Sequence, residues 1–455
     1  METTTKWLPE LAGLSWAGLS PDDRLAGVRL LHDALGISSA GAAADGVGPA
    51  LSALSDLSPG TVPAPWTRLH LSPASAALAL SALIHAWDFD DTHDDAVVHT
   101  ASVALPAALA AGIHSGRSGG AILDGFVTGV HVLSRLSLAA GPRRGVVRTA
   151  GLGAPAAAAA AARTLGLTAD RLGHAMALAL PAAGSPHSRQ VVEDSAVNKR
   201  LQPGLAAQAG VTAAYLAAAG VDGPAGWVEG GYGLLAHGAG AEGAGDPAAV
   251  LLAPGWEGAR LSLKPYPACR YTHAAITAAG EAAAELPATS AITTVDVHVP
   301  DGPAYALVSR PFARRGRPVI DAQFSIPWLV AARLVTGRVD LTTIAGDTLL
   351  DRAVEDFAAR VAVHQDRRST TAMAPATVVL HTAHGRVEAT APMTGSPEHP
   401  LTAEALAAKT AACARVGGRD PDTTVTAITS LVEALPGLAP ADTAAALAAL
   451  GAGAA

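Results

Sequence analysis

Residues 85–95 read His-Ala-Trp-Asp-Phe-Asp-Asp-Thr-His-Asp-Asp, and His99 closes the segment. Five carboxylates and three imidazoles therefore lie within fifteen residues, in a chain where only 15% of the residues are charged. Five unpaired carboxylates cannot be buried as anions, because burial without partners is costly or shifts their pKa. Residues 77–86 are mostly apolar, which argues against a fully solvated charged surface. We therefore predict that residues 85–99, hereafter the acidic segment, form one wall of an active site.

The spacing of the acids allows two more specific interpretations. If residues 88–99 formed one helix, its period would place Asp88, Thr92, Asp95 and His99 on a single face. Residues 90–94 also match the DDxxD pattern with which helical terpene synthases hold magnesium and a diphosphate, and oxygen ligands suit magnesium. A magnesium-dependent enzyme acting on a diphosphate is thus one alternative, although the sequence shows no second metal-binding motif.

Composition favours closely packed helices. Half of the residues are hydrophobic, much of that share is alanine, and aromatic residues make up only 4%. After about residue 260 the pattern changes: residues 291–299 alternate and are rich in β-branched side chains, and 377–382 and 385–390 predict a hairpin. The order is helices, then an α+β block, then helices, so we predict a mainly α protein with an inserted α+β module. The predicted helices cover 21–56, 72–87, 100–113, 120–138, 149–165, 169–182, 204–219, 246–252, 324–336, 341–359, 402–416 and 439–450.

Charge and cysteine content exclude several classes. The net charge is −8 and no basic run occurs, so we expect no nucleic-acid partner. Cys269 and Cys413 give neither a disulfide framework nor zinc-ligand spacing, which favours a reducing cytoplasm. The first residues lack a signal-peptide pattern, and the apolar runs are shorter than the roughly 20 residues that a spanning helix needs. We expect a cytoplasmic protein with no membrane partner.

Three further motifs have weaker meanings by themselves. Residues 238–243 satisfy GxGxxG, but no strand precedes them, which favours a flexible loop over a nucleotide site. Residues 198–204, Asn-Lys-Arg-Leu-Gln-Pro-Gly, put two cations just before a predicted helix, where anions are attracted. Residues 263–273 combine two stiffening prolines with Lys264, Arg270 and His273 at the change from helical to α+β texture.

Three of these stretches, in this order, make the chain resemble the MmgE/PrpD family, which includes 2-methylcitrate dehydratase, cis-aconitate decarboxylase and iminodisuccinate epimerase. The matching runs are residues 85–93, 199–208 and 264–273, with a weaker run at 322–328. The resemblance implies a large helical domain built from both chain ends, residues 1–262 and 397–455, and a smaller α+β lid at 263–396. It also implies a homodimer, and chemistry without a metal or an organic cofactor.

The resemblance also implies roles for individual residues. Asp88, Thr92, His99, Lys199 and His273 match catalytic positions of the family. Lys264, Arg270, Cys269, Trp328 and Arg200 match positions that would bind the substrate, with Arg270 holding a carboxylate in a two-point fork. The shared chemistry is removal of a proton beside a carboxyl or carbonyl group, for which His99 or Lys199 would serve as the base or the acid.

Three positions depart from the family pattern. Val147 and Trp328 stand where many members carry a histidine and a tyrosine, and Cys269 replaces a histidine of some members. A cysteine near Lys264 and Arg270 can have a lowered pKa, although a buried inert thiol is the commoner case. We predict a cofactor-independent lyase acting on a non-standard, less charged small molecule. An epimerase or isomerase on the same scaffold and a catalytically inactive member are the alternatives.

Overall fold

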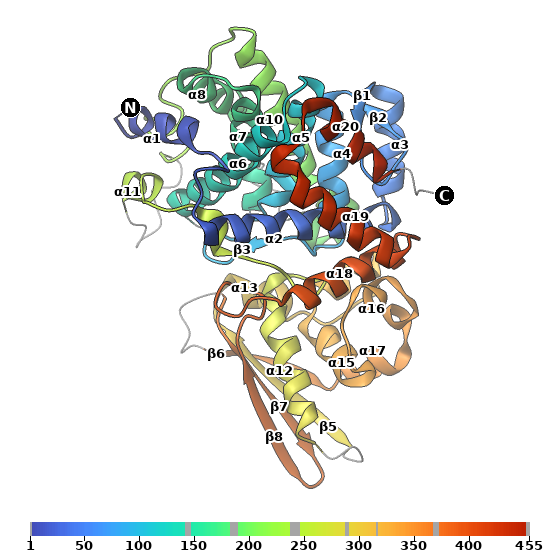
Figure 1. The fold of residues 1–455 in the computed structure, drawn as a ribbon. Coiled ribbons are helices and arrows are strands. Elements are labelled where there is room, and N and C mark those ends of the chain that lie inside the picture. Colours follow the sequence, from blue (N-terminus) through green and yellow to red (C-terminus); the bar gives the residue numbers. More distant parts are fainter. Residues whose placement is uncertain are drawn as a thin grey trace.

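The computed structural model describes residues 2–141, 147–182, 190–236, 246–286, 291–314, 317–366 and 373–451. The GxGxxG motif at 238–243 lies outside these ranges. A large bundle of helices occupies one half of the molecule, and a smaller part built of helices and a sheet occupies the other (Figure 1). The helix α18 runs along the boundary between the two parts (Figure 1). The structure is therefore mainly α, as the sequence predicts, while the domain boundaries at 262 and 396 remain predictions.

The helical bundle draws on the early and the late parts of the chain. Its buried apolar cluster contains Leu35 of α2 together with Cys413 of α18 and Ile428 of α19. Its helices are α1 (Glu2–Gly13), α2 (Pro21–Ser38), α3 (Val47–Leu57), α4 (Pro73–His85), α5 (Ala101–His114), α6 (Gly119–Ala140), α7 (Arg148–Leu165), α8 (Ala169–Leu178), α9 (Gln190–Glu193), α10 (Gln202–Ala218), α11 (Pro247–Leu251), α18 (Ala403–Val416), α19 (Pro421–Ala434) and α20 (Pro440–Ala449). Short 3₁₀ turns are η1 (Gly41–Ala43), η2 (Leu180–Ala182), η3 (Val197–Arg200), η4 (Glu257–Arg260) and η7 (Leu435–Gly437).

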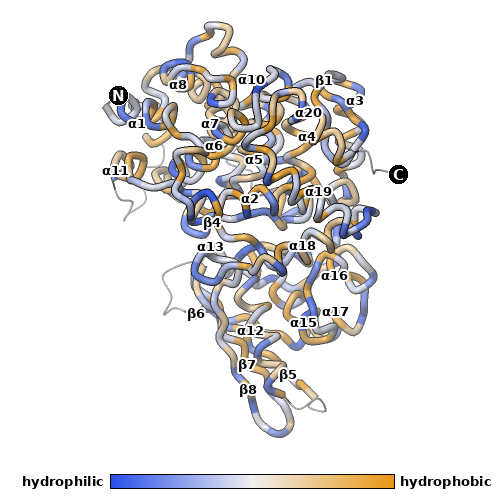
Figure 2. Tube along the Cα trace, viewed as in Figure 1, coloured by the Kyte–Doolittle hydropathy of each residue, from blue (hydrophilic) through white to orange (hydrophobic). Residues whose placement is uncertain are grey.

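Alanine lets the central helices approach closely. The run from Ala156 to Ala162 on α7 is fully buried, and α7 packs against α5, α6 and α10. A Cβ built on Gly210 of α10 would lie only 2.4 Å from the Cβ of Ala157, so only glycine fits that crossing. The orange tube through the bundle in Figure 2 shows how apolar this centre is. Pro155 lies inside α7 rather than in its first turn, because the helix already begins at Arg148.

One helix, α6, is long and apolar enough by composition to cross a membrane, among the residues that the structure describes. In this structure 78% of its most apolar window is buried within the protein. Core helices of soluble proteins share this property.

The smaller part is built on a four-stranded sheet with the order β6-β5-β7-β8. Its strands are β5 (Ile292–Pro300), β6 (Val361–Asp366), β7 (Ala376–Thr382) and β8 (Gly385–Ala391). The strand β5 pairs parallel with β6 and antiparallel with β7, and β7 forms the predicted hairpin with β8. The helices of this part are α12 (His273–Ala284), α13 (Pro303–Val308), α14 (Pro318–Gln323), α15 (Ile326–Thr336), α16 (Leu341–Ala345) and α17 (Arg352–Ala358), with 3₁₀ turns η5 (Arg270–Thr272) and η6 (Asp347–Leu350).

Two predicted long helices are each divided. The helix predicted over 21–56 ends as α2 at Ser38, the turn η1 follows, and α3 begins after Gly46, whose φ is 77°. The helix predicted over 341–359 is divided into α16 and α17, with extended backbone at Gly346. Sequence patterns missed α1, α12, α19 and the strand β6.

The acidic segment does not form a helix, so the predicted shared face of residues 88–99 is wrong. After α4 ends at His85, the chain turns through Asp88, whose φ is 53°. It then forms the short strand β3 (Thr92–His93), which pairs with β4 (Leu261–Ser262). This pairing brings the residues that follow β4 beside the acidic segment. A second two-stranded ladder joins β1 (Pro59–Pro63) and β2 (His70–Leu71).

Candidate active site

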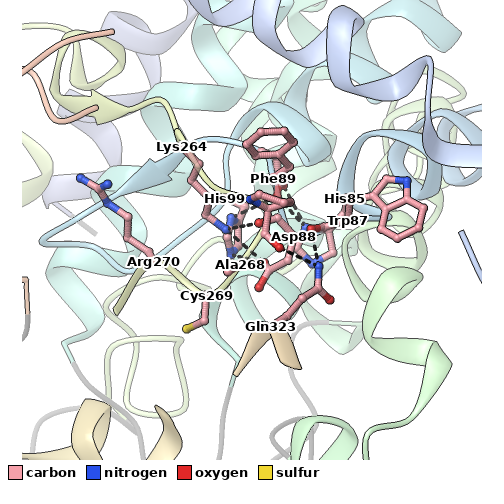
Figure 3. Close-up of polar contacts among 12 residues, drawn as sticks. His85, Trp87, Asp88, Phe89, His99, Lys264, Ala268, Cys269, Arg270 and Gln323 are labelled. Carbon is pink, nitrogen blue, oxygen red and sulfur yellow. Dashed lines mark hydrogen bonds and ion pairs between the residues drawn. The ribbon is translucent and has the colours of Figure 1, made fainter. Parts of the chain in front are cut away.

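Three segments that are far apart in the sequence meet at Asp88. Asp88 lies in the turn after α4, Lys199 in η3, and Lys264 directly after β4. The Lys264 ammonium donates to the Asp88 carboxylate Oδ1 at 3.1 Å and to the Asp88 carbonyl at 2.7 Å. Lys199 Nζ lies 3.6 Å from the same Oδ1. The structure therefore brings these three residues together, and Figure 3 shows Lys264 and His99 directed toward Asp88.

His85 and Asp90 extend this cluster, and sequence reasoning did not assign them to the site. The two Asp90 oxygens lie 3.0 and 2.9 Å from His85 Nδ1, and His85 Nε2 lies 2.6 Å from Lys199 Nζ. Because an ammonium only donates, His85 Nε2 accepts from Lys199, and the ring proton is assigned to Nδ1, which donates to Asp90. One feature of the sequence could have indicated this pair: His85 and Asp90 lie five residues apart within the acidic segment.

His99 is the least buried member of the cluster, with 17% of its side chain exposed. Its Nδ1 lies 2.8 Å from the Asp91 carbonyl, which can only accept, so Nδ1 carries the proton and Nε2 has a lone pair. That Nε2 lies 3.9 Å from Asp88 Oδ1. Burial lowers the pKa of His99 to about 3, so the ring is neutral near pH 7 and its Nε2 is available as a base.

The charges inside the cluster balance. Burial alone would raise the pKa of Asp88, but Lys199 and Lys264 hold it well below its usual range. Burial would likewise raise the pKa of Asp90, but the neighbouring His85 and then His99 hold it below its ordinary value. Both carboxylates are therefore ionised near neutral pH. Two anions and two ammonium groups share one buried region.

The first turn of α5 accommodates the remaining buried acid of this region. Asp91 accepts hydrogen bonds from the backbone and hydroxyl of Thr100, both at 2.8 Å, and from the backbone of Ala101 at 2.9 Å. The backbone N–H groups at a helix N-terminus favour a carboxylate, but burial and then the Asp90 charge outweigh them and raise the pKa of Asp91 to about 7. The helix α7 also supports the site, because Thr149 Oγ1 accepts from the backbone of His99 at 3.0 Å. Val147, at the N-cap of α7, lies two residues before that contact.

These contacts do not favour the DDxxD interpretation. The three acids of the motif have separate partners: Asp90 contacts His85, Asp91 caps α5, and Asp94 contacts Arg270. Ligand atoms of four side chains do lie within 4.8 Å of one another, in a group formed by His85, Asp88, Asp90 and His99. A cation there would face two ammonium groups, of which the Lys264 ammonium lies 3.1 Å from Asp88.

Arg270 and His273 lie in the junction between the two parts of the molecule. The Arg270 guanidinium donates two hydrogen bonds to the Asp94 carboxylate, from Nε at 3.0 Å and from Nη2 at 2.8 Å. Its Nη1 also donates to the Thr394 carbonyl at 2.7 Å. Its guanidinium points away from Asp88 in Figure 3. The fork predicted to hold a substrate carboxylate is thus occupied by Asp94. His273 is fully buried with Nε2 at 3.2 Å from the Ala268 carbonyl, and burial and then Arg270 hold its pKa well below its ordinary value.

Cys269, Arg200, Trp328 and Thr92 are all buried. Burial and then the Asp88 charge raise the pKa of the Cys269 thiol to about 12, so the lowered pKa is wrong and the inert-thiol alternative fits. Arg200 donates to the Asp45 carbonyl at 2.5 Å, and burial lowers its pKa to about 10. Trp328 on α15 belongs to the apolar core, and Thr92 Oγ1 has no hydrogen-bond partner within the described residues. The substrate-binding roles of Cys269, Arg200 and Trp328 and the catalytic role of Thr92 remain predictions.

A neutral imidazole, two ammonium groups and two carboxylates lie together where the helical bundle meets the α+β part. Enzymes that transfer protons use groups of these kinds. Residues 11–244 match the MmgE/PrpD N-terminal domain, and residues 266–433 match the MmgE/PrpD C-terminal domain. The chain belongs to the MmgE/PrpD family.

Curated relatives are cis-aconitate decarboxylases. The Aspergillus terreus protein is 31% identical over 228 residues, which cover 46% of this chain and 45% of that protein. A cis-aconitate decarboxylase-like protein of Aspergillus oryzae is 35% identical over 156 residues, 32% of each chain. The human cis-aconitate decarboxylase is 34% identical over 168 residues, 34% of this chain and 33% of that protein. The chain thus matches less than half the length of each relative.

Proposed function

We propose that this protein is a cofactor-independent lyase of the MmgE/PrpD family that transfers protons on a carbon atom next to a carboxyl or carbonyl group. The observation that carries the proposal is the pairing of a neutral His99 with the ammonium of Lys199 on either side of Asp88. A base and a proton donor that face one carboxylate are the groups that an elimination or a decarboxylation with reprotonation needs.

Each member of the cluster has a role in this proposal. His99 Nε2 takes a proton from the substrate, because its lone pair has no closer polar partner among the described residues than Asp88 Oδ1, at 3.9 Å. Lys199 donates a proton to the substrate carbon or to a leaving hydroxyl. Asp88 and Lys264 hold one another in place, and the Lys264 ammonium stabilises negative charge that develops on the substrate.

The same charges define the proposed substrate. Lys199 and Lys264 are already balanced by Asp88 and Asp90, and the Arg270 fork is occupied by Asp94. A molecule with three carboxylates would therefore find few uncommitted cations around this cluster, among the residues that the structure describes. We propose a substrate with one carboxylate next to the reacting carbon and a less charged remainder.

Isotope exchange tests the reaction class. The purified protein is incubated in D₂O with small unsaturated and hydroxylated carboxylic acids, cis-aconitate included, and followed by proton NMR. Loss of water or carbon dioxide with deuterium in the product supports the lyase. Exchange with neither loss identifies the epimerase alternative, and the absence of both exchange and turnover with every compound counts against the proposal.

Variants and EDTA complete the test. His99→Gln and Lys199→Met are expected to abolish turnover, whereas the matched exposed controls His384→Gln and Lys6→Met retain it. Turnover that persists in EDTA agrees with the proposal, and turnover lost in EDTA and restored by magnesium contradicts it. From the family resemblance we also propose a cytoplasmic homodimer; light scattering of the purified protein measures the number of chains.

A further inference from the structure

Four backbone carbonyls near Asp88 each accept a hydrogen bond from a buried or nearly buried side chain. We call residues 87–91 the Asp88 loop. The loop is buried, so its carbonyls cannot bond to bulk water and need donors from the protein. The four contacts are Gln323 Nε2 to the Trp87 carbonyl at 2.6 Å, Lys264 Nζ to the Asp88 carbonyl at 2.7 Å, Lys409 Nζ to the Phe89 carbonyl at 2.9 Å, and His99 Nδ1 to the Asp91 carbonyl at 2.8 Å.

The loop needs this support because its central residue is strained. Asp88 has a φ of 53°, in the left-handed region that favours glycine. A non-glycine residue stays in such a conformation only where the surrounding structure determines it several times over. The strain matters for the site, because the direction of the Asp88 carboxylate toward Lys199 and Lys264 depends on this backbone conformation.

Gln323 ties together two of the segments that meet at the site. Its side-chain Nε2 donates to the Trp87 carbonyl and also, at 3.0 Å, to the Pro267 carbonyl. The backbone carbonyl of Gln323 accepts from the backbone N–H of Cys269. The Asp88 loop and the segment that follows Lys264 are thereby held by one amide group. Figure 3 shows Gln323 at the lower edge of the cluster, between these two segments.

Lys409 supports the loop from the other side. It lies on α18, and its ammonium contacts Asp33 at 2.6 Å and lies 3.9 Å from the centre of the Phe89 ring. Asp33 and Lys409 are 1% and 7% exposed, so this ion pair is deeply buried. Among the described residues, no hydrogen bond or ion pair joins Lys409 to Asp88, Lys199 or His99, so Lys409 reaches the site through Phe89.

We propose that Gln323 and Lys409 are positioning residues, which hold the Asp88 loop in its strained conformation and so assemble the cluster of Asp88, Lys199 and His99. The inference rests on the proposed function for its catalytic consequence, but the conformational part can be tested without any substrate. It adds to the site two residues whose hydrogen bonds to the loop go to its backbone carbonyls.

The experiment compares Gln323→Met and Lys409→Met with the wild-type protein. Both replacements keep the approximate length of the side chain and remove its donors. Thr277→Val is the matched control, because Thr277 also makes hydrogen bonds in the α+β part, to Tyr266 and Thr394, without touching the loop. Asp33→Asn combined with Lys409→Met removes the carboxylate that Lys409→Met would leave buried and unpaired, and this keeps the variant folded.

Two readouts are used. In the first, the histidine rings are labelled with carbon-13 and the titration of His99 is followed by NMR. In the variants the loop relaxes, and the pKa of His99 is expected to rise from about 3 toward the ordinary 6.5. In the turnover assay, kcat is expected to fall by about 100-fold with little change in KM, because the acting groups are displaced rather than removed. The Thr277→Val control should match the wild type in both.

The outcomes separate the two proposals. If folded Gln323→Met and the Asp33→Asn/Lys409→Met double variant both keep the wild-type His99 titration, the positioning role is refuted, whatever the turnover. If His99 titrates differently in these variants but the wild-type protein turns over no substrate, the positioning role stands and the lyase proposal fails. Lys409→Met alone could change the His99 titration while the Asp33→Asn/Lys409→Met double variant titrates like the wild type. Lys409 would then serve only as the counter-ion of Asp33, and its part of the proposal would be overturned.

Discussion

The replacement of Lys264 by methionine should destabilise the protein strongly at neutral pH. Lys264 is fully buried, and its ammonium lies 3.1 Å from Asp88 Oδ1. Methionine fills most of the same volume, so the main effect is electrostatic. The Asp88 carboxylate would then retain only the ammonium of Lys199, at 3.6 Å. Removal of one partner of a buried ion pair costs about 3–5 kcal/mol, and we expect a loss in that range at pH 7.

The loss should depend on pH in a defined direction. In the wild type the pKa of Asp88 is depressed, so its contribution to stability is present above the unfolded value of 3.8 and disappears as the pH falls through the folded value. In the variant, burial is no longer offset by two ammonium groups and raises the pKa of Asp88. The folded variant then binds a proton that the unfolded chain does not, and its deficit should be smaller at pH 5 than at pH 7.

Urea unfolding at pH 5 and pH 7, followed by tryptophan fluorescence and circular dichroism, measures the difference. Coincident transitions by the two probes are required before a free energy is derived. The exposed replacement Lys6→Met is the control and should change the stability by less than about 0.5 kcal/mol. A loss below about 1 kcal/mol for Lys264→Met, or an equal loss at both pH values, would refute the assignment of this pair as a buried, mutually dependent unit.

Three further predictions follow from the other contacts. Because the pKa of His99 is about 3, kcat/KM should show no acidic limb near pH 6.5 when measured from pH 8 to pH 5; a limb at that position would mean that His99 is not the neutral base described above. Arg270→Lys should lower the unfolding midpoint more than it changes KM, because it breaks the fork on Asp94; a raised KM at unchanged stability would instead assign Arg270 to the substrate. Cys269 and Cys413 should resist iodoacetamide at pH 8 in the native protein, because burial raises the pKa of each thiol to about 12; rapid alkylation seen by intact mass spectrometry would contradict their burial.

Much of the fold follows from local patterns in the sequence. The alternation of residues 291–299 predicts β5, and the paired runs 377–382 and 385–390 predict the hairpin of β7 and β8. The alanine-rich stretch predicts the buried helix α7. The strand β6 was missed, because Val361–Asp366 is short and ends in polar residues that leave little alternation to detect. The helix predicted over 21–56 ends at Ser38 and resumes after Gly46, whose φ is 77°, and a periodic pattern does not encode these backbone conformations.

The site was predicted in part, and the limit has a physical cause. Charge density identifies residues 85–99 as a candidate wall of the site, and the family resemblance singles out Asp88, His99, Lys199 and Lys264. Gln323 was noted only as part of the weaker family match at 322–328, and Lys409 was not noted. Their contacts with the Asp88 loop join carbonyls 236 and 320 residues away along the chain, and such contacts leave no local pattern in the sequence. The raised pKa of Cys269 was missed for a related reason. The sequence places the thiol near two cations but does not reveal that it is fully desolvated beside Asp88.

The ion pair between Asp33 and Lys409 sets an order of events during biosynthesis. Asp33 leaves the ribosome early, whereas Lys409 follows only after the sheet of β5–β8 has been translated. Domains generally fold from the N-terminal side as the nascent chain emerges. Until α18 arrives, the Phe89 carbonyl lacks its donor and Asp33 has no counter-ion, so a partly translated chain should hold the helices of its first half without a working centre. The active-site cluster is therefore completed late in synthesis, when α18 has packed against the helices of the first half.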